Sequence, residues 1–160
     1  MEIFLEQIGE SKKFLKTADH LAYVTYPLLN DEKILLIVAD NLYNSLLKAM
    51  DSLLTYERYY KRISNIPENF ENKFDIFRSE ILKRYGFNPE LILIIRDMKE
   101  IIDSRKKSSF EFIKRNNLVV LSNEFRVKTL NLKKVKDYIT ITKVFIDKIN
   151  KVMGQNARRF

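Results

Sequence analysis

The chain has 160 residues, a length that suits one domain with one hydrophobic core. It contains no cysteine and only three glycines, which excludes disulfides, cysteine nucleophiles and glycine-rich phosphate loops. The formal net charge is +8, and no apolar run approaches the roughly 20 residues that a membrane span requires.

The first predicted helix ends near a proline. Pro27 disfavours helical geometry in the residue before it, so we expect this helix to stop near Tyr26. Asn30 is then expected to cap the next helix. The inward face, at helical spacing, consists of Phe14, Leu15, Ala18, Leu21, Ala22 and Thr25.

The second predicted helix is long, running from about Asp31 to Ile63 without glycine or proline. At 1.5 Å per residue it would extend roughly 50 Å and form the spine of a bundle. The segment from Asn65 to Pro67 is expected to break it. Its apolar face consists of Leu35, Val38, Leu42, Ala49, Leu53, Tyr56, Tyr60 and Ile63.

Two further helices are predicted before residue 105. A third helix begins near Phe70 and ends at Gly86, a residue suited to the left-handed position that terminates helices. Asn88 and Pro89 open a fourth helix as its cap and first helical residue. The inward positions are Phe70, Phe74, Phe77, Ile81 and Tyr85, followed by Leu91, Ile94, Ile95, Met98, Ile101 and Ile102.

The segment after residue 105 changes in character. Ser108 and Glu111 have the spacing of a capping box, which predicts a short helix through Arg115. An apolar run at residues 118–121, polar turn residues, and alternation over residues 125–129 then predict a β-hairpin at about 118–129.

A final helix is predicted to begin after Asn131, which would cap it, and to end at Gly154. The predicted fold is therefore mostly all-α, a helical bundle of five to six helices with one small β-hairpin before the C-terminal helix. We expect a single domain over residues 1–153 and a basic tail over residues 154–160.

A family resemblance accompanies this architecture. The stretch from Ala39 to Leu54, with Tyr43, spaced alanines and a Leu-Leu pair, resembles the second helix of HEPN proteins, and residues 18–21 resemble the first. The resemblance implies a helical bundle, frequent dimerisation and an RNA-linked role. In nuclease members, an arginine followed after four to six residues by a histidine cleaves RNA. No histidine follows Arg115, so cleavage is not implied.

Residues that could support catalysis are few. His20 is the only histidine, and a lone histidine on a helix is more often a packing or surface residue than a base. Glu57 lies beside basic neighbours at helical spacing, as expected of surface pairing. Asp97 and Glu100 share a helix face, and their basic neighbours favour a solvated surface over a general acid and base. We therefore expect a protein that is not an enzyme, without metal or cofactor.

The positive charge lies in the last third of the chain. Residues 1–104 contain 14 Lys and Arg against 17 Asp and Glu, whereas residues 105–160 contain 15 against 4. This asymmetry favours a polyanionic partner, and RNA over duplex DNA because no DNA-reading motif is visible. Phe110, Phe112 and Phe125 lie among these cations as candidate stacking residues. The predicted nucleic-acid-binding residues are Arg105, Lys106, Lys107, Lys114, Arg115, Arg126, Lys128, Lys133, Lys134 and Lys136.

Two alternatives remain at this stage. The first is that the charges only keep the protein soluble. The second is that the protein is a homo-oligomeric or partner-binding scaffold whose hairpin pairs with a second copy. Exposed Phe125 and Val127 would favour assembly, while an exposed face of Arg126, Lys128 and Lys133 would favour a polyanion. A ribonuclease or toxin-like module ranks last. Without an apolar span or a basic N-terminal start, we expect a cytoplasmic protein that does not enter the membrane.

Overall fold

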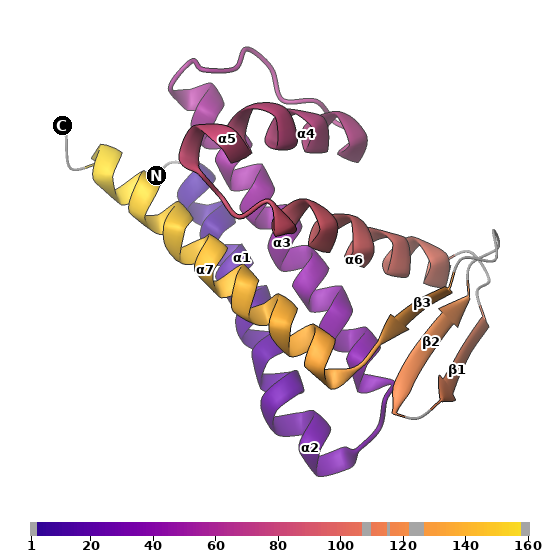
Figure 1. Cartoon of the computed structure of the whole chain (residues 1–160). Helices are drawn as coiled ribbons and strands as arrows, with labels where there is room; N and C mark the ends of the chain where they lie inside the picture. Colours follow the sequence, from indigo (N-terminus) through magenta and orange to yellow (C-terminus); the bar gives the residue numbers. More distant parts are fainter. Residues whose placement is uncertain (1–2, 107–109, 115, 122–126, 158–160) are drawn as a thin grey trace.

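The computed structural model describes residues 3–106, 110–114, 116–121 and 127–157. Over these residues the chain forms a helical bundle with a small antiparallel sheet before the C-terminal helix, which confirms the predicted fold (Figure 1). The elements are α1 (Ile3–His20), the π-helical turn η1 (Leu21–Thr25), α2 (Tyr26–Leu29), α3 (Ile34–Tyr59), α4 (Phe70–Ile76), the π-helical turn η2 (Phe77–Ile81), α5 (Leu82–Tyr85), α6 (Glu90–Lys106), β1 (Phe110–Lys114), β2 (Asn117–Leu121), β3 (Val127–Leu130) and α7 (Leu132–Ala157).

The first helix continues through Pro27 instead of ending at Tyr26. The π-helical turn η1 precedes the proline, and the backbone N–H of Tyr26 donates to the carbonyl of Leu21. Pro27 lies at the start of α2, where a missing N–H is tolerated best. Asn30 adopts a left-handed conformation with φ 49° and terminates this helix, so the prediction that it caps the next one was wrong.

Helix α3 is the centre of the bundle and contacts α1, α6 and α7. It is shorter than predicted: its 26 residues extend about 39 Å, and the chain turns at Lys61, which has φ 61°. The polar interruption at Ser45 is explained by α1, because each hydroxyl of Ser11 and Ser45 donates to the other residue's backbone carbonyl, at 2.7 and 2.9 Å. This reciprocal pair joins α1 to α3 without an unsatisfied polar group at its centre.

The predicted helices after α3 begin and end close to where local signals place them. The side chain of Asn69 accepts a hydrogen bond from the backbone N–H of Asn72 at the start of α4, and Gly86 ends α5 with φ 65°. Asn88 accepts from the backbone N–H of Glu90 at 3.0 Å. The inward aromatic side chains of this segment, Phe74 and Phe77, are fully buried.

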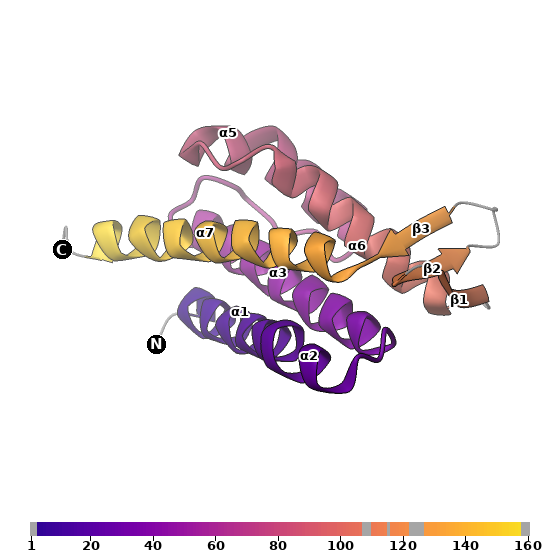
Figure 2. The same cartoon turned by 60° about the horizontal axis from the view of Figure 1, so that its bottom comes forward.

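The sheet has three strands in the order β1-β2-β3, with both pairs antiparallel. The predicted hairpin is confirmed as β2 and β3, but the predicted short helix ending at Arg115 was wrong because Phe110–Lys114 pairs with Asn117–Leu121 as β1. Ser108 lies outside the described residues. Leu118, Val120 and Leu130 are buried, and β2 contacts α6, so the sheet lies against one end of the bundle (Figure 2).

Helix α7 crosses the bundle and contacts both α1 and α3. The carboxamide oxygen of Asn131 accepts from the backbone N–H of Lys134 at 2.8 Å, which confirms the predicted cap. The helix continues to Ala157, so the prediction that Gly154 ends it and begins a tail was wrong. Glycine costs a helix only about 1 kcal/mol relative to alanine, too little to stop it by itself. Among the described residues, no helix is long and apolar enough to cross a membrane.

Candidate functional site

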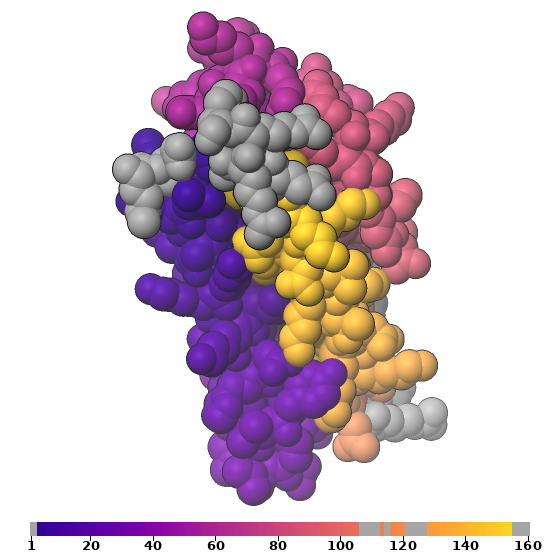
Figure 3. All heavy atoms as spheres, turned by 90° about the vertical axis from the view of Figure 1, so that its left-hand side faces the viewer, coloured from indigo at the N-terminus to yellow at the C-terminus, as the bar shows by residue number. Residues whose placement is uncertain are grey.

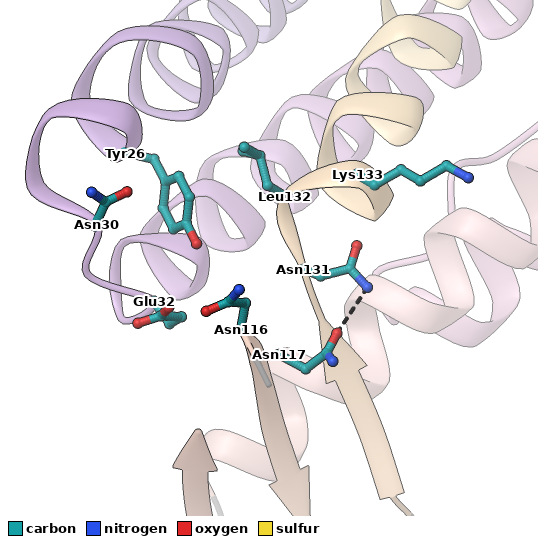
Figure 4. A pocket seen from close by; sticks show the side chains of 8 residues that line it. All are labelled: Tyr26, Asn30, Glu32, Asn116, Asn117, Asn131, Leu132 and Lys133. Atoms are coloured by element: carbon teal, nitrogen blue, oxygen red, sulfur yellow. Dashed lines mark hydrogen bonds between the residues drawn. The ribbon is translucent and has the colours of Figure 1, made fainter. Parts of the chain in front are cut away.

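A pocket of about 610 Å³ with a mixed polar and apolar lining lies at the end of the bundle nearest the sheet (Figure 4). Four chain segments meet there: the end of α2, the connection to α3, the turn between β1 and β2, and the start of α7. We call it the asparagine pocket, because four of its eight lining residues are asparagines. The lining residues are Tyr26, Asn30, Glu32, Asn116, Asn117, Asn131, Leu132 and Lys133.

The asparagines are present for local backbone reasons. Asn30 and Asn116 have φ values of 49° and 64°, a left-handed conformation that asparagine tolerates better than most residues. Asn131 caps α7 and also donates from its amide nitrogen to the side-chain oxygen of Asn117, at 3.0 Å. The residues that let the chain turn therefore also line the pocket, and two of the carboxamides are held by each other.

Tyr26 forms the aromatic wall of the asparagine pocket. Its hydroxyl is directed toward Glu32 and Asn116 in Figure 4. Burial, and then the nearby negative charge of Glu32, raise the pKa of Tyr26 above its ordinary value. The phenol thus remains protonated near neutral pH and is available as a hydrogen-bond donor.

A second hollow, of about 420 Å³, adjoins the asparagine pocket and shares Leu132 and Lys133 with it. Tyr23 lies in this hollow with 45% of its surface exposed. The amines of Lys136 and Lys143 lie over the Tyr23 ring, at 4.6 and 5.8 Å from its centroid. Figure 3 shows the indigo to purple surface of the N-terminal helices beside the orange to yellow surface of α7, in agreement with the contacts of α7 with α1 and η1. The Lys143 amine also lies 2.7 Å from the carboxylate of Asp19, so the region combines an exposed aromatic ring with two cations, one of which has an acidic partner.

Lys128 and Lys134 do not join this region, because they are paired with acidic residues of α6. The Lys128 amine lies 3.2 Å from Asp97 and 2.9 Å from Glu100, and the Lys134 amine lies 2.8 Å from Asp97. Tyr138 donates to Asp97 at 2.7 Å. We call these five residues the Asp97 cluster.

The Asp97 cluster corrects the prediction that Asp97 and Glu100 form a solvated surface pair. The Asp97 side chain is only 13% exposed. Burial alone would raise the pKa of Asp97, but hydrogen bonds from Lys134, Tyr138 and Lys128 together lower it below the ordinary value. The hydrogen bond to Glu100 is the main reason that the pKa of Lys128 is raised. The cluster fastens the sheet and α7 onto α6.

The predicted nucleic-acid-binding residues therefore divide into groups. Lys133 and Lys136 line the two hollows, and Lys128 and Lys134 belong to the Asp97 cluster. Arg105 is exposed on α6, while Lys106 and Lys114 belong to α6 and β1. The remaining predicted cations and the stacking candidate of the hairpin lie outside the described residues: Lys107, Arg115, Phe125 and Arg126.

The sequence did not point to the asparagine pocket. The sequence pattern places Tyr23 and Tyr26 in an amphipathic helix, and it indicates helix caps and turns at the four asparagines. The one signal in the sequence was that all four asparagines lie at or next to the ends of helices and strands, which are the segments that meet at this pocket.

Glu57 was predicted to lie on the surface, and this was wrong. Its side chain is fully buried at the far end of α3, where Arg84 and the Tyr85 hydroxyl bond its two oxygens. Arg62 approaches one of these oxygens at 3.8 Å. Burial and the hydrogen bond to Glu57 raise the pKa of Tyr85. No pocket described in this part of the chain adjoins Glu57, so we regard the cluster as a clamp between α3 and α5.

The described acidic and imidazole groups outside these clusters are not gathered around one point. His20 is exposed on α1, and within the described ranges no three His, Asp or Glu residues are grouped to hold a metal ion.

The chain as a whole was compared with known proteins. No family model, curated protein or solved structure matches it.

Proposed function

We propose that this protein is a non-enzymatic, RNA-associated protein that binds the phosphate backbone of single-stranded RNA through its basic C-terminal third. The observation that carries the proposal is Tyr23, whose exposed ring lies beneath the amines of Lys136 and Lys143. Unpaired bases stack on exposed aromatic rings, and a base that displaces the Lys136 amine from the Tyr23 ring would leave this amine free to contact a flanking phosphate. Lys133 extends the basic surface to the asparagine pocket.

The Asp97 cluster narrows the set of residues that carry this function. Two acidic and two basic side chains compensate one another there, so Lys128 and Lys134 contribute little to the external field. We therefore assign phosphate contact to Lys133 and Lys136 first.

The test is binding of a labelled single-stranded RNA and its duplex across a salt series. Changing Lys133 and Lys136 to Ala should reduce the slope of log affinity against log salt by about 1.4, since each contact to a single strand contributes about 0.7. The matched control changes Lys83 and Lys151, two exposed lysines elsewhere, and removes the same charge. Equal slopes for both variants would refute the assignment.

The aromatic part of the interface has its own variant. Tyr23→Ala should weaken single-strand binding by about tenfold, because stacking of one base contributes about 1–3 kcal/mol. It should leave the salt slope unchanged, which separates loss of stacking from loss of phosphate contact.

A homo-oligomeric scaffold is the second candidate, favoured by the apolar tip of the first helix. Leu28 and Leu29 are 78% and 66% exposed there, and Val24 is exposed one turn earlier. Membership of the HEPN family, a homodimeric state and a cytoplasmic location are further hypotheses from the sequence. Light scattering on the parent chain and on Leu28→Asp tests assembly: a larger parent species that the substitution dissociates would support it, and a monomeric parent would refute it.

A further inference from the structure

We propose that the asparagine pocket holds one unpaired nucleobase and reads its edge through hydrogen bonds. The inference deepens the proposed RNA binding and rests on it for the strand that delivers the base.

The chemistry of the lining selects for such a ligand. The side chains of Asn30 and Asn116 bring donors and acceptors without net charge, whereas Asn117 and Asn131 are hydrogen-bonded to each other. The carboxylate of Glu32 also lines the pocket, and Lys133 lies at its rim. A simple anion would meet the carboxylate of Glu32, and an apolar ligand would leave the amides unpaired. The edge of a nucleobase presents adjacent donors and acceptors in one plane, which asparagine side chains match in pairs.

The asparagine pocket has more than enough room for one base. Its volume of about 610 Å³ lies within the range of about 300–1,000 Å³ that is usual for small-molecule sites. Tyr26 and Leu132 supply an aromatic and an aliphatic wall for the faces of a planar ring.

Part of the asparagine pocket is already organised in the free protein. Asn131 is fixed twice, by the backbone N–H that it accepts at the start of α7 and by its hydrogen bond to Asn117. Asn30 and Asn116 have a left-handed backbone, which fixes where their side chains leave the chain but not the side chains themselves. Groups fixed before binding lose little conformational entropy when a ligand arrives, which favours selective recognition.

The position of the pocket connects it to the proposed backbone interface. It shares Leu132 and Lys133 with the hollow that contains Tyr23. In Figure 4 the Lys133 amine is directed away from the asparagines, so it lies at the rim and not in the base-reading region. A strand with one base stacked on Tyr23 would place a neighbouring base at the pocket and the intervening phosphate near Lys133.

Two substitutions remove pocket amides without straining the backbone. Asn30→Gly and Asn116→Gly delete the side chains at left-handed positions that glycine adopts freely. The matched control is Asn65→Gly, an exposed asparagine in the connection after α3, at the opposite end of that helix. Circular dichroism melts would confirm that all three variants fold.

The experiment measures binding of labelled octamers of A, U, C or G, and of one octamer with an abasic central position in the preferred sequence. We expect one homopolymer to bind about tenfold more tightly than the others, and the octamer with one abasic position to keep most of that advantage, because any of its seven remaining bases can enter the pocket. The double variant Asn30→Gly with Asn116→Gly should bind all octamers alike with an unchanged salt slope, while Asn65→Gly keeps the preference.

The outcomes distinguish the two proposals. Equal binding of every octamer, abasic included, with a steep salt slope would overturn the base pocket and leave RNA binding intact. Binding of free AMP, UMP, CMP or GMP without octamer binding, abolished by the double variant, would support the pocket and overturn the RNA proposal. Absence of binding in both arms would overturn both.

Discussion

Replacing Asp97 with Asn tests the role of the Asp97 cluster. The substitution keeps the shape of the side chain but removes the charge that Lys128 and Lys134 share, and its NH2 group replaces the oxygen that accepts from one of the two ammonium groups. The Tyr138 hydroxyl loses its charged acceptor as well. The perturbation therefore affects α6, β3 and α7 together.

The expected cost follows from the geometry. Hydrogen bonds to charged groups contribute about 1.5–3 kcal/mol each in favourable settings, but both lysines are about a quarter exposed and would recover water. We expect the free energy of unfolding to fall by about 2–3 kcal/mol at pH 7. Asp75→Asn is the matched control: its ion pair with Arg78 is exposed, and its loss should cost about 0.5 kcal/mol or less.

The pH dependence supplies a second, independent readout. Because the folded-state pKa of Asp97 lies below its ordinary value of 3.8, its contribution is fully present above that value and is lost as the pH falls through the folded-state pKa. The difference in stability between parent and Asp97→Asn should therefore be constant from pH 7 to about pH 5 and shrink below pH 3.8.

Urea denaturation followed by circular dichroism, repeated across this pH range, measures both quantities. A cost below about 1 kcal/mol at pH 7, or a difference that stays constant down to pH 3, would refute the reasoning. The control at Asp75 guards against a general effect of lowering the negative charge.

Three further predictions concern single side chains. Glu57→Gln leaves Arg84 and Tyr85 without their buried charged partner and should lower Tm by about 6–12 °C in calorimetry, corresponding to about 3 kcal/mol; a shift below 2 °C would contradict the clamp. Asn131→Ala removes the cap of α7 and should cost about 0.5–2 kcal/mol in urea melts, and an unchanged midpoint would count against it. Gly86→Ala forces alanine to φ 65° and should cost about 1–2 kcal/mol in the same melts, although the nearest side-chain atom leaves room for the methyl group; equal stability would argue against the left-handed turn.

Local signals in the sequence predicted several helix boundaries. Asn88 with Pro89, Gly86 and Asn131 act on their own neighbours within a turn of chain, so their effect needs no tertiary information. Pro27 was misleading because a π-helical turn, which no local rule foretold, let the helix continue past it.

Interactions between distant segments account for the errors. The capping-box pattern of Ser108 and Glu111 yielded to strand pairing, in which Glu111 opposes Val120. Glu57 has basic neighbours on its own helix, but its partners are Arg84 and Tyr85, which reach it from α5. The asparagine pocket is composed of four segments. The pattern of any one segment could not predict it, because the pocket depends on how the four segments are brought together.

The position of α7 also affects how the protein is made on the ribosome. Its buried face, from Val135 to Met153, packs into the core formed with α1 and α3, which are synthesised long before it. Until α7 emerges from the ribosome, the apolar surfaces that it covers have no partner within the chain. Asp97 of α6 likewise lacks its ion pair with Lys134 of α7. The nascent chain therefore passes through a stage in which apolar surface is exposed and Asp97 is without this ion pair. A translation pause just before residue 132 would lengthen the time for which chaperones and proteases can act on this state.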